Sequence, residues 1–167
     1  SEKALTFLYE QVEEEFAAFY RLINHDDEGE FKAKLEPADG KLDLRVDFHK
    51  KGMFPPGAYH SEGHQDGMGV CLYLALMKHV MGANFTFAVL DDVVMSVDAQ
   101  HRKQFCKLLK THFPNTQFII TTHDQVWARQ IRSEGLIGAK AAVAFHHWTV
   151  ETGPVLDEVA EIWDQID

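Results

Sequence analysis

The order of the apolar patterns in the sequence predicts an α/β protein. Two apolar runs that each end in polar residues indicate this fold class. Residues 85–90 are apolar and precede two aspartates at 91–92, and the apolar run 118–121 leads to His123. Residues 99–112 between them carry apolar side chains at helical steps. Strand, helix and strand in this order form a parallel βαβ unit, which places ligands at the carboxyl ends of its strands.

The first half of the chain predicts a long helix followed by a hairpin. Residues 4–23 repeat apolar side chains every three or four positions, which is the stripe of an amphipathic helix. Residues 31–36 and 41–49 flank the turn-forming tetrapeptide Pro37-Ala38-Asp39-Gly40, and the second arm alternates apolar with charged residues. The glycines and prolines that follow predict a loop over 50–59.

The second half adds helices around the βαβ unit. Residues 62–80 read as a helix that is nearly all apolar after Met68, so we expect it to be buried on most sides. A helix is expected from Asp124 to about residue 133, a strand over 141–150 and a short acidic helix over 156–166.

Length and composition favour one soluble domain. The chain has 167 residues, of which 46% are hydrophobic and 25% charged, which is typical of a globular protein and excludes disorder and disulfide scaffolds. No apolar run reaches the roughly 20 residues of a membrane span, and the first residues do not resemble a signal peptide. We therefore expect a cytoplasmic protein with no membrane partner, in which Cys71 and Cys106 are buried, reduced thiols.

The net charge of −10 is divided unevenly and does not exclude a nucleic-acid partner. Residues 1–30 carry −7 and residues 151–167 carry −6, whereas residues 31–150 carry +3. The global charge therefore says little about any one face of the molecule.

Adjacent carboxylates at a strand end suit phosphate chemistry. Neighbouring strand-end residues point in different directions, so Asp91 can hold a hydrated Mg²⁺ while Asp92 reaches an attacking water. The simpler alternative is that both are acidic turn residues. Ser96, Asp98 and His123 strengthen the functional interpretation, because a phosphate site uses hydroxyls and an imidazole at the same edge.

The segment before the apolar helix offers a second candidate site. Ser61 suits a helix N-cap, Gly63 lets the backbone approach a ligand, and a helix N-terminus attracts phosphate. A capping box of Ser61 and His64 without any ligand explains the same residues equally well.

Four motifs in order resemble the C-terminal half of an ABC-type ATPase head of the SMC and RecF-like coiled-coil ATPases. Residues 60–65, His-Ser-Glu-Gly-His-Gln, align with the signature L-S-G-G-Q/E, and residues 87–92 with the Walker B strand. Residues 96–98 resemble the D-loop, and His123 the switch histidine. The resemblance implies a three-layer P-loop NTPase-type lobe with parallel strands, flanking helices and an N-terminal hairpin. It also implies that residues 1–25 are the end of a coiled coil and 26–167 the lobe.

The resemblance also assigns roles. It implies that Asp91 binds Mg²⁺, that Asp92 polarises the attacking water and that His123 contacts the γ-phosphate of ATP. Ser61 and Gly63 would donate to ATP bound on the opposite head, and Asp98 would communicate across a head dimer. Phosphoryl transfer needs positioning and charge neutralisation, which these residue types supply.

The chain departs from the family pattern in its signature motif and at the position of the catalytic acid. His60 replaces the signature leucine, Glu62 its first glycine and His64 its final Gln or Glu, which alters the donors and the charge near a triphosphate. Asp92 stands where most ABC ATPases have glutamate, although RecF-like proteins share the aspartate.

The largest departure is that the sequence contains no Walker A motif, G-x-x-x-x-G-K-S/T. The resemblance therefore implies an N-terminal Walker A lobe, supplied in cis or in trans, without which ATP hydrolysis is not expected. The implied partners are that lobe, a second head and DNA. The implied processes are DNA repair, recombination, chromosome maintenance or defence against foreign DNA.

Three alternatives compete with this interpretation. The chain could be a non-catalytic interaction module that keeps the ABC fold, or a metal-dependent phosphatase or nuclease that uses Asp91, Asp92 and Asp98. His60 and His64 also have metal-ligand spacing with His49 nearby in the sequence, but no H-E-x-x-H motif is present, which disfavours zinc.

Overall fold

The computed structural model describes residues 2–38, 41–47, 49–58, 60–94, 96–138 and 140–156. Its α-helices are α1 (Glu2–Ile23), α2 (His25–Glu28), α3 (Glu62–Met81), α4 (Ala99–His112) and α5 (Gln125–Ser133), with 3-10 turns η1 (Pro56–Ala58) and η2 (Gly82–Asn84). Its strands are β1 (Lys32–Ala38), β2 (Lys41–Asp47), β3 (Met53–Phe54), β4 (Phe87–Asp91), β5 (Gln117–Thr121), β6 (Phe145–Thr149) and β7 (Gly153–Leu156).

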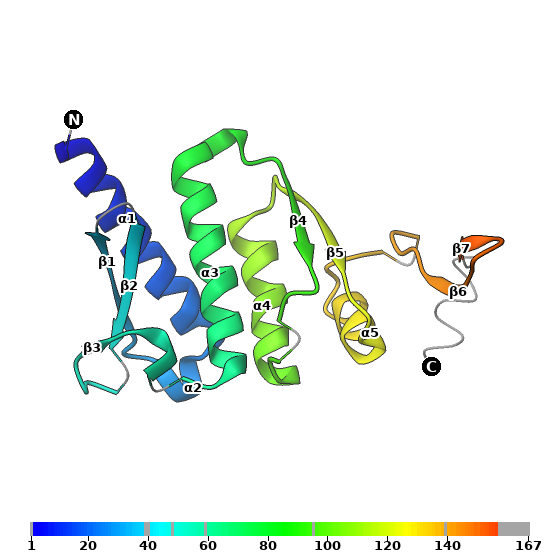
Figure 1. The fold of residues 1–167 in the computed structure, drawn as a ribbon, viewed down its shortest axis with the longest axis horizontal. Helices are drawn as coiled ribbons and strands as arrows, with labels where there is room; N and C mark the ends of the chain where they lie inside the picture. Colours follow the sequence, from blue (N-terminus) through cyan, green and yellow to red (C-terminus); the bar gives the residue numbers. More distant parts are fainter. Residues whose placement is uncertain are drawn as a thin grey trace.

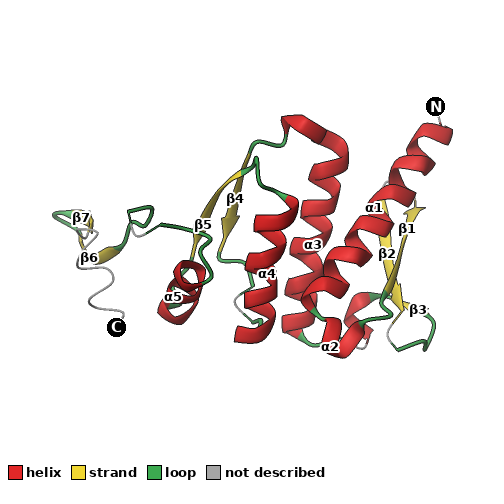
Figure 2. Ribbon diagram, turned by 180° about the vertical axis from the view of Figure 1, so that it is seen from behind, coloured by secondary structure: helices red, strands yellow, loops and turns green. Residues whose placement is uncertain are grey.

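The helices α1, α3 and α4 lie side by side as the centre of the molecule (Figure 1). The β1–β2 hairpin covers α1 on one side, and β4, β5 and α5 lie beyond α4 on the other (Figures 1 and 2). The β6–β7 hairpin projects from this body at the end opposite α1 (Figures 1 and 2). The described elements therefore form a mixed α/β arrangement with three small sheets.

The first helix forms as its apolar stripe predicts. Val12, Phe16, Phe19 and Tyr20 are completely buried against α3, α4 and β1. In the first two turns, by contrast, the stripe is at most partly buried, and Leu5 is 46% exposed. The stripe is therefore fully buried only from Val12 onward, and the coiled coil expected for residues 1–25 stays a prediction.

The predicted hairpin is confirmed, and the predicted loop after it contains a further strand. β1 and β2 pair antiparallel from Lys32↔Asp47 to Ala38↔Lys41, and residues 39–40 of the turn lie outside the described residues. β3 adds to β2 through Val46↔Phe54. The expectation of a loop over 50–59 was therefore wrong for β3, because a strand of two residues leaves no periodicity to detect.

The apolar helix predicted over 62–80 is α3, but it is not buried on most sides. Cys71, Leu74 and Ala75 are completely buried, whereas Tyr73 is 37% exposed and Val80 58% exposed. One face of the helix packs against α1, and the exposed residues lie on another face.

The predicted βαβ unit is confirmed, with β4 and β5 in parallel register from Phe87↔Gln117 to Asp91↔Thr121. Ala88 and Leu90 are buried, but Phe87 and Val89 on the other face of β4 are about half exposed. Continuous apolar strands are typical of parallel sheets that are covered on both faces. Here one face of the sheet is open among the described residues.

The C-terminal part differs from its prediction. The strand expected over 141–150 is shorter, Phe145–Thr149, and it pairs antiparallel with β7, which the sequence did not predict. Leu156 ends β7 and does not begin a helix; the remaining residues of the expected helix over 156–166 lie outside the described residues. No helix among the described residues is long and apolar enough to cross a membrane.

Candidate functional site

The parallel register of β4 and β5 brings the predicted strand-end residues together. Because Asp91 pairs with Thr121, the residues that follow each strand leave the sheet at the same edge. The Nδ1 atom of His123 lies 3.0 Å from Oδ1 of Asp92. The predicted catalytic acid and the predicted switch histidine are thus direct neighbours, although they are 31 residues apart in sequence.

Thr121 connects the two aspartates. Its hydroxyl donates a hydrogen bond to Oδ1 of Asp91 and accepts one from the backbone N–H of Asp92, with N and Oγ1 3.1 Å apart. Asp92 has a φ of 52°, in the left-handed region that is uncommon for residues other than glycine. This conformation ends β4, and the side chain of Asp92 meets His123.

The Asp92–His123 pair is open to solvent. The Asp92 side chain is 47% exposed and the His123 side chain 77% exposed. A carboxylate next to an imidazole can exchange a proton with a water, and an accessible imidazole N–H can contact an anion. The geometry therefore suits proton transfer and anion contact on a ligand that approaches this edge.

Asp91 has donor chemistry that fits Mg²⁺, because the residue is exposed and its carboxylate has a second hard oxygen beyond the one bonded to Thr121. Among the described residues, no group of three or more His, Cys, Asp and Glu side chains is arranged to hold a metal ion. The three-aspartate metal site of the phosphatase or nuclease alternative and the zinc alternative therefore lack a ligand set here.

Ser61 caps α3 as the capping alternative expects. Its Oγ accepts from the backbone N–H of His64 at 3.4 Å and lies 2.7 Å from the ring Nδ1 of His64. Both Ser61 and Gly63 remain at the surface or partly exposed. The Ser61 hydroxyl thus accepts from one of the first-turn N–H groups that have no partner within the helix.

Gly63 allows the N-terminus of α3 to lie directly against the segment that precedes α4. A Cβ on residue 63 would lie 2.3 Å from the carbonyl oxygen of Ser96. The backbone N–H of Ser96 also donates to the carboxylate of Asp66 at 3.4 Å. The predicted signature and D-loop segments are therefore in direct contact.

Asp98 caps α4. Its Oδ1 accepts from the backbone N–H groups of Gln100 and His101, at 2.9 and 3.2 Å, and its Oδ2 pairs with the His101 ring. Partial burial raises the pKa of Asp98, but the hydrogen bonds and charge of His101 outweigh it, so the pKa lies below its ordinary value. Asp98 is thus held as an ionised cap.

Arg102 is a connecting residue that sequence reasoning missed. It is 6% exposed, its Nε donates to the carbonyl of Val94 at 3.1 Å, and its guanidinium pairs with Asp124 at 2.7 Å. Asp124 in turn caps α5 directly after His123. Arg102 therefore ties the loop after β4 to the loop after β5, and its only sequence signal is a charge among the apolar positions of α4.

Glu28 is the second residue that sequence reasoning missed. Its side chain is 2% exposed, and it lies 3.1 Å from Nε2 of His60. His60 is therefore a buried residue that points into the core, at the position where the signature has leucine. An acidic residue in a polar break carries no sequence signal of burial.

An open groove of about 420 Å³ lies between the first half of α3 and the end of β4. Its lining is mostly apolar and includes Asp66 and Asp92. It thus connects the signature end of α3 with the strand-end cluster.

Comparisons with solved structures agree with this arrangement. A structure described as "Structural biochemistry of ATP-driven dimerization and DNA stimulated activation of SMC ATPases" superposes over 99% of this chain and 97% of its own, at 16% identity and a TM-score of 0.67. The chain has the fold of an SMC ATPase head lobe. The Smc head domain from Pyrococcus yayanosii superposes over 94% of this chain and 28% of its own, at 14% identity and a TM-score of 0.63.

Two further likenesses show how much of a head the lobe represents. The SMC head domain from Thermotoga maritima matches 73% of this lobe and 41% of its own chain, at 24% identity and a TM-score of 0.50. Structural maintenance of chromosomes protein 2 of Plasmodium falciparum is 27% identical over 125 residues, which are 72% of the lobe and 10% of that protein. No family model matches the sequence. The lobe therefore spans about a tenth of its curated relative.

Proposed function

We propose that the chain is the C-terminal lobe of an SMC/RecF-like ATPase and supplies the signature motif, Walker B, D-loop and switch histidine of a composite site that hydrolyses ATP. The observation that carries the proposal is the contact of Asp92 with His123 beside Asp91, at the carboxyl edge of a parallel sheet in an SMC-head fold. Such an edge is where α/β sheets bind nucleotides.

Each strand-end residue has a separate role in this proposal. Asp91 holds Mg²⁺, which neutralises phosphate charge when it is bound. Asp92 orients the attacking water and accepts its proton, and His123, placed 3.0 Å from Asp92, donates to the γ-phosphate. Thr121 keeps both aspartates in place by its two hydrogen bonds.

The second lobe of the head supplies the Walker A loop, in cis or in trans. The open apolar face of the β4–β5 sheet supports this part of the proposal, because Phe87, Val89 and Ile119 are 47–51% exposed there. An uncovered apolar sheet face marks an interaction site. The Walker A lobe would cover this face and complete the three-layer arrangement.

A second head would meet the N-terminus of α3. Ser61 and the backbone N–H groups near Gly63 would donate to the γ-phosphate of ATP on the opposite head, and Asp98 would lie at the same interface. The contact between Gly63 and Ser96 supports this, since it places the signature and the D-loop on one surface. ATP would then join two heads into a dimer.

By its likeness to SMC heads, the ATPase would act on DNA in repair, recombination, chromosome maintenance or defence against foreign DNA, in the cytoplasm. α1, which lies within residues 1–25, would be the end of a coiled coil. A solved Smc head from Pyrococcus furiosus is bound to the C-terminal domain of ScpA. The same proposal extends to a protein partner of that kind for this chain.

The test is ATP hydrolysis by a protein that contains this lobe and the Walker A lobe. Asp92→Asn should lower turnover by about 10²–10⁴-fold, as expected for the loss of a general base, while ATP binding persists. Asp43→Asn is the matched control, because Asp43 is a partly exposed aspartate paired with Lys41 on the distant β2 strand. Unchanged turnover in Asp92→Asn would remove Asp92 from this role.

One observation favours the non-catalytic interaction module as a second candidate. Glu62 is exposed in the first turn of α3, where its carboxylate would repel a triphosphate. A non-catalytic module predicts that the reconstituted heads do not associate when ATP is added. Light scattering with and without ATP separates this candidate from the ATPase.

A further inference from the structure

A buried carboxylate lies beneath the signature segment and joins three parts of the chain. Glu28 follows α1 in the short helix α2, and its Oε1 accepts a hydrogen bond from the Tyr20 hydroxyl at 2.7 Å. Its Oε2 lies 3.1 Å from Nε2 of His60, and both side chains are 2% exposed or less. Burying a carboxylate is unfavourable unless donors surround it. The Tyr20 hydroxyl and the His60 ring take that place at the two oxygens of Glu28.

The hydrogen-bond partners of His60 fix the protons of the pair. Its Nδ1 lies 3.2 Å from the carbonyl oxygen of Pro56, which can only accept, and its Nε2 faces the Glu28 carboxylate. Both ring nitrogens of His60 therefore face oxygen acceptors, which favours their acting as donors. His60 and Glu28 thus form a fixed anchor, which leaves His64 as the member of the cluster that reaches solvent.

His64 stands between this anchor and the signature serine. Its side chain is 31% exposed, its Nε2 lies 3.5 Å from Oε1 of Glu28, and its Nδ1 lies 2.7 Å from Oγ of Ser61. The carboxylate favours a proton on Nε2, because the other neutral tautomer would turn a lone pair toward a negative charge. In neutral His64, Nδ1 must then accept, and the Ser61 hydroxyl donates its proton to the ring.

Protonation of His64 reverses this hydrogen bond. In the imidazolium, Nδ1 carries a proton and donates it to Oγ of Ser61. The Ser61 hydroxyl proton is then free to turn toward a ligand at the N-terminus of α3. The charge of the imidazolium also favours an anion there.

We propose that His64 is a positioning residue whose protonation decides whether Ser61 can donate a hydrogen bond to a phosphate ligand. The proposal rests on the proposed function, because it takes the γ-phosphate of ATP on a second head as that ligand. Phosphate binding at the signature then strengthens as the pH falls. A glutamine or glutamate, the residue of the family pattern at this position, would not titrate in this way.

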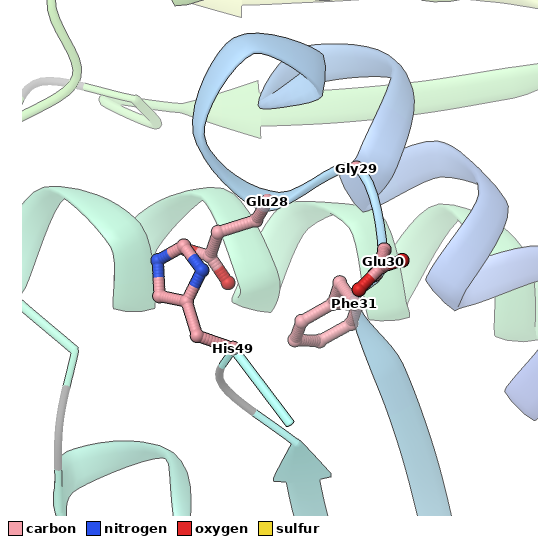
Figure 3. A pocket seen from close by; sticks show the side chains of 5 residues that line it. All are labelled: Glu28, Gly29, Glu30, Phe31 and His49. Carbon is pink, nitrogen blue, oxygen red and sulfur yellow. The ribbon is translucent and has the colours of Figure 1, made fainter. Parts of the chain in front are cut away.

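Other ionisable groups lie around Glu28, the buried carboxylate that His64 contacts. A cavity of about 100 Å³ beside Glu28 is lined also by the His49 and Glu30 side chains, as Figure 3 shows. The groups to be monitored alongside His64 are Tyr20 of α1, Glu28 of α2, His49, Glu30 and His60 of the connecting segments, and Glu62 and Asp66 of the first turns of α3.

The first test needs no nucleotide. Long-range ¹H–¹⁵N spectra of the chain, labelled at histidine and serine, report which ring nitrogen of His64 carries the proton at each pH, and His64→Gln assigns the signals. We expect the neutral ring to carry its proton on Nε2 and the Ser61 signals to move with the same midpoint as His64. A neutral ring protonated on Nδ1, or Ser61 signals that ignore His64, would overturn the inference.

The second test measures ATP-dependent head association in the complete protein with its Walker A lobe, at about pH 6 and about pH 8. Wild type should gain about tenfold more affinity on acidification than His64→Gln, which is the effect of one hydrogen bond to a charged group. Any change in affinity that comes from the titration of ATP itself is the same for both proteins, so it cancels in this comparison. Equal gains in wild type and His64→Gln would contradict the proposal.

His79→Gln is the matched control. His79 lies on the same helix, outside the signature, and its Nε2 is 3.3 Å from the Glu15 carboxylate. It should keep the wild-type pH response, and loss of that response in the control would count against a specific role of His64. Absence of ATP-dependent association at every pH in wild type would refute the proposed function. The spectra would still decide the state of the Ser61 hydroxyl.

Discussion

Gly63 and Ser96 are in backbone contact so close that a Cβ on residue 63 would lie 2.3 Å from the Ser96 carbonyl oxygen. The contact joins the first turn of α3 to the segment before α4, two parts of the chain that carry separate predicted motifs. Glycine is required here because the obstructing atom belongs to the backbone and cannot rotate away.

Gly63→Ala should therefore displace the Ser96 segment and lower the free energy of unfolding by about 1–3 kcal/mol, the usual effect of overpacking. Gly69→Ala, in the same helix, is the matched control, since its Cβ would meet no atom within 4 Å. That control should stabilise the protein by about 0.5–1 kcal/mol. Urea unfolding measures both, and equal effects of the two substitutions would contradict the contact.

Arg102→Met should destabilise the protein by about 2 kcal/mol at neutral pH, because Asp124 and the Val94 carbonyl both lose a charged donor. Arg102→Lys should recover part of the loss, since a single ammonium cannot serve both acceptors in the arginine geometry. Urea unfolding at neutral pH checks the order wild type, lysine, methionine. A lysine variant as stable as wild type would show that charge alone matters.

The effect of Arg102 should also depend on pH. The hydrogen bond from Arg102 holds the pKa of Asp124 below its ordinary value. The resulting stabilisation is present above the unfolded-state pKa and is lost as the pH falls through the lowered folded-state pKa. The difference in unfolding free energy between wild type and Arg102→Met should therefore shrink on acidification, and a constant difference would contradict this link.

Tyr20→Phe should lower the free energy of unfolding by about 1.5–3 kcal/mol, because it removes a donor from the buried Glu28 carboxylate. Tyr73→Phe is the control, because Tyr73 is 37% exposed on α3 and should change stability little. Thermal unfolding of both variants provides the measurement. Equal stability of Tyr20→Phe and wild type would show that Glu28 does not need this bond.

Both cysteines should resist alkylation in the native protein. Each is completely buried, and burial raises the pKa of the Cys106 thiol to about 12 and that of Cys71 well above its usual range. At about pH 8 only about one Cys106 thiol in ten thousand is then ionised. Mass spectrometry after iodoacetamide treatment should show labelling only in denaturant, and rapid labelling of the native chain would contradict the burial.

The sequence predicted those features that follow from local patterns. Alternation along β2 and the turn residues before it predicted the hairpin, and the ends of two apolar runs predicted that Asp92 and His123 would lie at the same edge of the sheet, where the structure shows them in contact. Parallel strands make the second prediction safe, because strand ends that are distant in sequence share one edge.

What escaped prediction depends on contacts between distant residues. His60 and Glu28 are 32 residues apart, and no periodicity links an acidic residue of a polar segment to a buried histidine. β7 was missed because it has only four residues, the last of which, Leu156, also begins a pattern that suits a helix. The bridging role of Arg102 likewise appears only once two loops are seen to converge on it.

The open face of the β4–β5 sheet has a consequence for how the protein is maintained in a cell. Half-exposed Phe87, Val89 and Ile119 on a short parallel sheet are the kind of surface that chaperones, proteases and aggregates recognise. A copy of the protein in which this face stays uncovered would therefore be short-lived or prone to precipitation.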